Sequence, residues 1–434
     1  MGFYTYNGPI GCKETATAFY FELLSNNEYT IYYRRNNEHL FQDWIEIKSM
    51  DSINVIKKMS FMELYYQLDE LLSSGYILIN GHGFFPTSRN ALCYNNLLEF
   101  KICLRTLGME DRFMSYRDDQ KKWAQDLLPE FFRAEGNGEI NGKSYPFVLK
   151  KPLLNLWEGI REDAISYFNE NKIPWWEGTE DGPTGHLVSS QVACVNHLFL
   201  LRQRKDLATA VLRQIDEDII SAERIDDGFV EFEVIGKKNY LGERQHTRGA
   251  NATSIDAVML GRKAKKNIFV SIEWKYTENY DGKRLYGTEE YHPRPDIYNP
   301  LLEEQNCPID SDKVKNLGKE PFEALYYEPF YQLMRQTLLS WKMVDSNEYG
   351  ADEYIHLHIV PDENVEMLEG VTSKDLQKID DNNLDYKNME LSWVDALMKS
   401  SKYMRISPKY FLEPLKHEKD TKSLLQYLEK RYWQ

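Results

Sequence analysis

The chain has 434 residues, of which 42 % are apolar and 13 % are aromatic, and this length predicts two or three folded domains with packed cores. Its formal net charge of −15 argues against a protein that coats nucleic acid by charge alone, although an enzyme with a local basic groove remains compatible with it. The five cysteines are widely spaced and form no Cys-x-x-Cys pair, which argues against a zinc site or a disulfide scaffold.

Residues 1–175 mix short strand-like runs with helical ones and predict an α+β domain, for which we expect a recognition or regulatory role. Ser60–Leu72 is expected to be a helix, and Tyr76–Ile79 a strand that ends in a turn. Residues 153–169 have apolar side chains at helical spacing. The turn-rich stretch from residue 174 onwards favours a domain boundary after residue 175.

Residues 176–434 alternate between helical and strand-like patterns, which predicts an α/β fold with a mixed central sheet flanked by helices. The insertion at 278–320 is rich in Tyr, Pro and Gly. The expected helices lie at 186–201, 206–222 and 322–343, and the expected strands at 229–235, 253–260, 268–277 and 354–360.

Candidate catalytic side chains lie on one face of the strand expected at 268–277. Because side chains alternate along a strand, Glu273 and Lys275 share a face, and the neighbouring apolar side chains point to the core. Asp256 lies on the preceding strand, and the residues 261–267 can form a hairpin between the two. This pairing would place Asp256 beside Glu273.

Two adjacent carboxylates repel each other unless a cation lies between them, and oxygen ligands favour Mg²⁺ or Mn²⁺. A metal at Asp256 and Glu273 would activate a water molecule and neutralise charge on a phosphate. Lys275 would orient the attacking water or stabilise the transition state by its charge. The pattern therefore predicts a divalent-metal site that is suited to chemistry at a phosphate.

This passage resembles the PD-(D/E)xK nuclease superfamily, which has the restriction-endonuclease-like fold, over residues 186–360. Asp256 matches the first acidic position of that family, and Glu273-Trp274-Lys275 matches its Glu-x-Lys. Ile255 stands where the family pattern has Pro. The resemblance implies metal-dependent hydrolysis, with the main-chain carbonyl of Trp274 as a further metal ligand.

The acidic-x-Lys spacing has little specificity alone, because it also occurs at 46–48, 119–121, 281–283, 385–387 and 420–422. Only Glu273-x-Lys275 combines an apolar strand, an upstream Asp strand and flanking helices. The alternative is an exposed strand face that carries a Glu–Lys pair.

Further residues are expected to support the site. For one group, the functional role is contact with the metal or the phosphate, and the alternative is a cap or a brace within the fold. These residues are Glu243, Gln191, Gln332, Arg335 and Gln336. Others would contact nucleic acid, or form a solvated turn: Lys263, Lys265, Lys266 and Arg248. His356 and His358 share one strand face, either as metal ligands or as part of a partly buried sheet.

The leading hypothesis is a Mg²⁺-dependent DNA endonuclease of restriction or defence type. A homodimer is one oligomeric state that would suit it. A nuclease acting on RNA or single strands under ligand control stays open, as does a non-catalytic nucleic-acid-binding protein with this fold. No run of about 18 apolar residues and no signal-peptide pattern occurs, so we expect a cytoplasmic protein without a membrane segment.

Overall fold

The computed structural model describes residues 115–433 except 181, 250–251, 281–283, 287–293 and 370–388, together with five strands in the preceding part of the chain. The chain divides into two compact units, Met1–Ser115 and Tyr116–Gln434. In the described residues, no helix has the length and apolar character needed to cross a membrane.

The described strands of the first unit form one sheet in the order β3-β2-β1-β4-β5. All pairs are antiparallel except β1 with β4. The predicted strand at Tyr76–Ile79 is confirmed as β4, whereas the helix predicted at Ser60–Leu72 lies outside the described residues. The other strands are β1 (Thr17–Leu23), β2 (Tyr29–Arg35), β3 (Ile45–Met50) and β5 (His82–Gly83).

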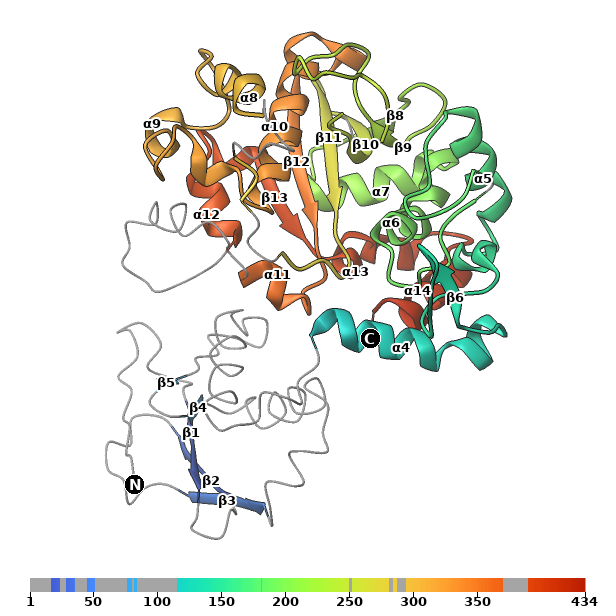
Figure 1. Ribbon diagram of the computed structural model, residues 1–434, viewed down its shortest axis with the longest axis vertical. Coiled ribbons are helices and arrows are strands. Elements are labelled where there is room, and N and C mark those ends of the chain that lie inside the picture. Colours follow the sequence, from blue (N-terminus) through green and yellow to red (C-terminus); the bar gives the residue numbers. More distant parts are fainter. Residues whose placement is uncertain are drawn as a thin grey trace. The chain divides into compact units, whose positions relative to one another are not determined.

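The second unit contains a six-stranded mixed sheet in the order β13-β12-β11-β10-β8, in which β9 also pairs with β10 (Figure 1). The pair β10 and β11 is an antiparallel hairpin, whereas β11, β12 and β13 run parallel. This arrangement confirms the predicted mixed sheet flanked by helices. The strands are β8 (Ser221–Glu223), β9 (Glu231–Val234), β10 (Ile255–Arg262), β11 (Asn267–Trp274), β12 (Glu353–Ile359) and β13 (Tyr403–Ile406).

Helices surround this sheet, and a separate small hairpin joins β6 (Gly138–Ile140) to β7 (Lys143–Tyr145). The α-helices are α4 (Tyr116–Asp126), α5 (Arg161–Glu170), α6 (Ser190–Leu198), α7 (Lys205–Ile215), α8 (Arg294–Leu302), α9 (Ser311–Val314), α10 (Phe330–Asp345), α11 (Val365–Glu369), α12 (Met389–Asp395), α13 (Pro408–Phe411) and α14 (Lys422–Arg431). Short 3₁₀ or π turns occur at 128–132, 152–155, 199–203, 323–325, 348–350, 400–402 and 413–417.

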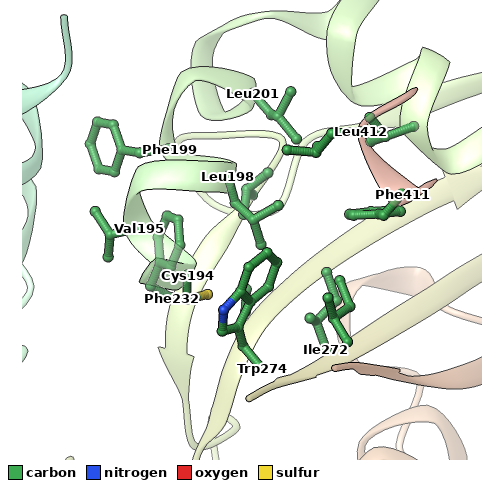
Figure 2. Packing of buried hydrophobic residues seen from close by; sticks show 14 of the residues in the cluster. Cys194, Val195, Leu198, Phe199, Leu201, Phe232, Ile272, Trp274, Phe411 and Leu412 are labelled. Atoms are coloured by element: carbon green, nitrogen blue, oxygen red, sulfur yellow. The ribbon is translucent and has the colours of Figure 1, made fainter. Parts of the chain in front are cut away.

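The two faces of β11 carry different kinds of side chain. Ile272 and Trp274 point into the main hydrophobic core, where α6 supplies Cys194, Val195 and Leu198 (Figure 2). The opposite face carries Glu273, and α10 packs on that side, because Gln336 of this helix donates a hydrogen bond to Glu273. The acidic side chain of β11 therefore lies on the face covered by α10, away from the core beneath α6.

The helices predicted in the second unit are shorter than their apolar spacing suggests, and those expected at 186–201 and 322–343 begin at Ser190 and Phe330. For the other two, tertiary contacts account for the difference. The helix predicted at 153–169 begins only at Arg161, and upstream the backbone N–H of Trp157 donates to the side chain of Asn196 instead of to a helical carbonyl (2.8 Å). The helix predicted at 206–222 ends at Ile215, because the chain then joins the sheet edge as β8. Local helix propensity yields to tertiary pairing in both places.

The predicted domain boundary at residues 175 and 176 lies inside the second unit. The rings of Phe168 and Trp175 stack with centroids 3.8 Å apart in the main core. The hydroxyl of Tyr167 donates to Glu231 Oε2 at 2.7 Å, which ties α5 to β9. Residues after Tyr116 therefore belong to the same core as the six-stranded sheet.

Truncation of Trp175 tests this packing, with its neighbour Trp176 as a matched control. Trp175 is 6 % exposed and Trp176 is 64 % exposed. We expect Trp175→Ala to lower the free energy of unfolding by about 3–5 kcal/mol, because it leaves a cavity beside Phe168. Trp176→Ala should change it by less than about 0.5 kcal/mol. Urea unfolding of the full chain measures both, and equal losses would contradict the proposed packing.

Candidate active site

The antiparallel register of β10 and β11 positions the acidic residues. Ala257 pairs with Ile272, so the next step of the ladder places Asp256 opposite Glu273. On the other side of β11, Glu273 pairs with His358 of the parallel strand β12. The predicted juxtaposition of Asp256 and Glu273 at the end of the hairpin is therefore present in the structure.

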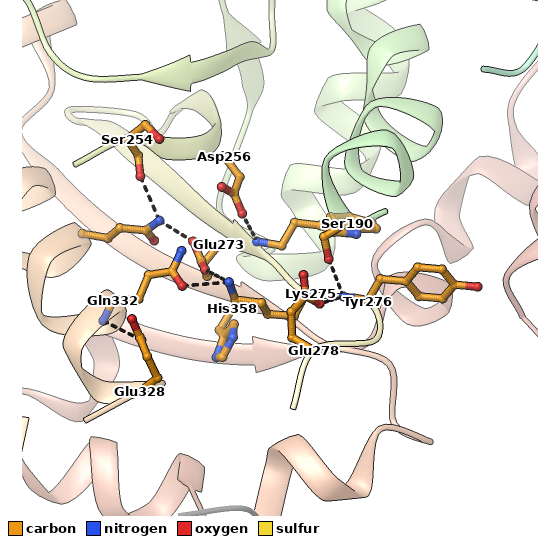
Figure 3. A network of polar contacts seen from close by, with 12 residues as sticks. Ser190, Ser254, Asp256, Glu273, Lys275, Tyr276, Glu278, Glu328, Gln332 and His358 are labelled. Carbon is orange, nitrogen blue, oxygen red and sulfur yellow. Dashed lines mark hydrogen bonds and ion pairs between the residues drawn. The ribbon is translucent and has the colours of Figure 1, made fainter. Parts of the chain in front are cut away.

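Each acidic side chain is held differently (Figure 3). Asp256 Oδ2 accepts a hydrogen bond from the backbone N–H of Trp274 at 2.7 Å. Glu273 is fully buried, and its Oε1 lies 2.6 Å from Lys275 Nζ in an ion pair. Lys275 Nζ also donates to Gln332 Oε1 at 2.8 Å. Two carboxylates and one ammonium thus converge where β10 begins and β11 ends.

Helix α10 supplies two glutamines to this point, one turn apart on one face. Gln332 accepts from Lys275, and Gln336 Nε2 donates to Glu273 Oε2 and to the backbone carbonyl of Ser254 (3.0 Å). Gln336 thus contacts the acidic pair directly, and Gln332 contacts Lys275; a contact of either glutamine with a metal or a phosphate stays a prediction.

Burial and neighbouring charges act together on the ionisation of these groups. Burial raises the pKa of Asp256 well above its usual value, and the nearby carboxylate of Glu273 raises it further. Burial alone would lower the pKa of Lys275, but the adjacent Glu273 outweighs it and the pKa of the ammonium is raised well above its usual value. Lys275 is therefore a fixed positive charge at neutral pH.

The donor set is suited to a hard divalent cation. Glu273 Oε1 is buried and receives no hydrogen bond from the described residues, so its charge is met only by the ion pair with Lys275. No group of three or more His, Cys, Asp or Glu side chains within the described residues is arranged to hold a metal. Mg²⁺ is commonly bound by one or two carboxylates together with waters and substrate phosphates, and Asp256 and Glu273 match that pattern.

A third carboxylate, Glu233 on β9, lies beside this pair and was not predicted from the sequence. The β9–β10 register places it opposite Asp256, between the pairs Ile255–Val234 and Ala257–Phe232. Its backbone is in the left-handed region (φ 49°), which is unusual for a residue other than glycine. Burial raises its pKa. The alternation of side chains along β9 predicts the face on which Glu233 lies, but it does not predict that β9 pairs with β10.

Gln191 contacts Glu233 rather than Asp256 or Glu273. Gln191 Nε2 donates to Glu233 Oε1 at 2.9 Å, and Ser254 donates to the other oxygen at 2.9 Å. Arg248, predicted to bind nucleic acid, donates from Nε to the backbone carbonyl of Glu233 (2.9 Å) and from Nη1 to that of Asn171 (2.8 Å). These residues brace the acidic edge of the sheet.

Glu243 and Arg335 meet at Thr253, just before β10. Glu243 accepts from the backbone N–H of Thr253 (2.8 Å) and from the hydroxyl of Tyr298 (2.6 Å). Arg335 Nη1 donates to Thr253 Oγ1 at 3.2 Å. Both residues are thus engaged in holding the chain that leads to Asp256, and the structure places neither against Glu273.

The lysines of the hairpin turn are not brought to the acidic pair. Lys263 follows β10 and forms an ion pair with Asp216. Lys265 and Lys266 belong to the same turn. Because β10 begins at Ile255 and rises roughly 3.3 Å per residue, the turn lies roughly 20 Å from Asp256 along the strand. Contact of this turn with nucleic acid stays a prediction.

Comparison with known proteins gave one result. A protein-family model described as "Restriction Endonuclease associating with ARP" matches residues 118–433, which include the whole six-stranded sheet and the acidic pair. Neither the search of curated proteins nor that of solved structures returned a match.

Proposed function

Because the chain belongs to this family of restriction endonucleases, we propose that it is a divalent-metal-dependent endonuclease of PD-(D/E)xK type that hydrolyses phosphodiester bonds in DNA. The observation that carries the proposal is the convergence of Asp256, Glu273 and Lys275 at one end of the β10–β11 hairpin. The family match alone indicates a nuclease, whereas this geometry supports a specific site within it.

Asp256, Glu273 and the main-chain carbonyl of Trp274 would hold the metal. When bound, Mg²⁺ or Mn²⁺ would lower the pKa of a coordinated water and offset charge on the phosphate. The chain itself contributes the remaining chemistry. Glu273 and Lys275 are buried, so their charges act through a medium that screens them less than water does.

Lys275 is proposed to stabilise negative charge that develops on the phosphate. Its Nζ is already held by Glu273 Oε1 and Gln332 Oε1, so it needs little reorientation during the reaction. Gln332 restrains the ammonium without adding charge. The site is therefore organised before substrate arrives.

A plasmid-cleavage assay tests the proposal through metal removal. The wild-type chain should cut plasmid DNA in Mg²⁺ or Mn²⁺ and lose this activity in EDTA. Glu273→Gln should lose it as well, because the amide has no negative charge for the metal. Unchanged cleavage by Glu273→Gln would refute this site.

The same preparation separates the remaining alternatives. Duplex DNA, single-stranded DNA and RNA are compared as substrates. Faster cleavage of single-stranded DNA or RNA than of duplex DNA would favour a nuclease that acts on single strands or on RNA. Metal uptake without cleavage of any of them would support a non-catalytic binding protein. Three further expectations stay predictions: recognition or regulation by the N-terminal part, homodimer formation and a cytoplasmic location. Light scattering with and without DNA tests homodimer formation.

A further inference from the structure

His356, on β12, is a fully buried histidine that touches the helix carrying the site glutamines. Its Nε2 lies 3.1 Å from Gln336 Oε1, and its Nδ1 lies 2.9 Å from Thr337 Oγ1. Both ring nitrogens therefore have partners on α10. This excludes the pair of metal-binding histidines that the spacing of His356 and His358 left open, because His356 has no free nitrogen in this arrangement.

The chemistry of these partners fixes where the imidazole proton lies. The amide oxygen Gln336 Oε1 can only accept, so His356 Nε2 must donate to it. A neutral ring then accepts at Nδ1, and the Thr337 hydroxyl donates there. Burial lowers the pKa of His356 to about 3, in agreement with a neutral ring at physiological pH.

The proton on His356 in turn determines the orientation of the Gln336 amide. With Oε1 toward His356, both hydrogens of Nε2 are available, one for Glu273 Oε2 and one for the carbonyl of Ser254. All polar atoms of this amide are then paired. Flipping the amide would place its oxygen against a carboxylate and a carbonyl, where three acceptors would face one another.

We propose that His356 is a positioning residue for the metal site: through Gln336 it holds Glu273 Oε2, so that Glu273 Oε1, beside Lys275, is the oxygen that would bind a metal. The inference rests on the proposed function, since it assigns the orientation of a metal ligand. It agrees with the general rule that hydrogen bonds behind a metal ligand set its geometry and affinity.

Two carboxamide substitutions of His356 test the proposal. In His356→Gln the amide nitrogen takes nearly the place of Nε2 and can still donate to Gln336, whereas in His356→Asn it takes the place of Nδ1 and faces Thr337. The affinity for Mn²⁺ alone, measured by electron paramagnetic resonance, should stay near wild type in His356→Gln. It should fall roughly 10- to 100-fold in His356→Asn.

Gln336→Leu provides the second arm of a double-mutant cycle. Once the amide is gone, His356→Asn should cause no further loss of Mn²⁺ affinity. The proposal is overturned if His356→Gln and His356→Asn weaken Mn²⁺ binding equally, or if the losses from positions 356 and 336 add.

Failure of the proposed function has a different signature. The four proteins of the cycle are wild type, His356→Asn, Gln336→Leu and the double variant, and each is unfolded by urea in EDTA. Because His356 contacts Gln336, the losses in free energy of unfolding should be non-additive even without a metal. A wild-type chain that takes up no Mn²⁺ refutes the proposed function. Additive effects on unfolding refute the link through Gln336.

Discussion

Replacement of Lys275 by methionine is expected to reduce DNA cleavage at saturating Mg²⁺ by roughly 100- to 1000-fold, the effect of removing one preorganised charge-stabilising group. Lys275 Nζ lies 2.6 Å from Glu273 Oε1 and 2.8 Å from Gln332 Oε1, so the charge is fixed at the site. Methionine keeps an unbranched, flexible side chain but carries no charge. Uptake of Mn²⁺ should persist, because both carboxylates remain.

Lys121 provides a matched control, since Asp119-Gln-Lys121 repeats the acidic-x-Lys spacing on α4. Its Nζ pairs with Asp118 at 2.9 Å, and Lys121→Met should cut DNA at the wild-type rate. Removing one partner of a buried ion pair can cost about 3–5 kcal/mol, so urea unfolding in Mg²⁺ must show that Lys275→Met is folded. Folded Lys275→Met that cuts as fast as wild type would contradict the role of the ammonium.

The acidic pair was predictable because two short-range rules determine it. Alternation along β11 assigns Glu273 and Lys275 to one face, and a tight hairpin turn sets the register that brings Asp256 opposite. The same rules place the turn lysines at the other end of the hairpin from the acidic pair. Geometry within a single hairpin can be derived from sequence.

Long-range pairing could not be derived in the same way. Glu233 reaches Asp256 only because β9 pairs with β10, and more than twenty residues separate the two side chains along the chain. The edge strands β8 and β13 have three and four residues, too few for a periodic pattern. The polar, turn-rich stretch after residue 175 predicts a domain boundary there, whereas Trp175 is buried in the main core and residues from Tyr116 onwards belong to the second unit.

The proposed site gathers more negative than positive charge. Asp256, Glu273 and Glu233 lie at the ends of adjacent strands, and among the described residues only Lys275 forms an ion pair with Glu273. Without a cation this arrangement opposes folding, because like charges are held together in a poorly hydrated place. Metal binding would relieve that repulsion, so the proposed affinity for the metal and a lower stability of the metal-free protein would have one cause.

Replacement of Asp256 by asparagine should therefore stabilise the metal-free protein and abolish its response to metal. Burial and Glu273 raise the pKa of Asp256 above the value near 3.9 that it has in an unfolded chain. Between these two values the folded state holds more protons than the unfolded state, so wild-type stability falls as the pH rises through this window. The amide of Asp256→Asn does not titrate, and its oxygen can still accept from the N–H of Trp274.

Thermal unfolding in EDTA should give a higher Tm for Asp256→Asn than for wild type at pH 7, by roughly 2–4 °C for each kcal/mol relieved. The difference should shrink as the pH falls through the raised pKa of the folded wild-type carboxyl, and it should vanish below the unfolded value near 3.9. Mg²⁺ should raise the Tm of wild type but not of the variant, because only a ligand bound to the folded state stabilises it. Asp312→Asn, at an exposed acid on α9, should leave both responses unchanged. A lower Tm for Asp256→Asn in EDTA at pH 7, or equal stabilisation of both proteins by Mg²⁺, would show that Asp256 is a structural residue and not a metal ligand.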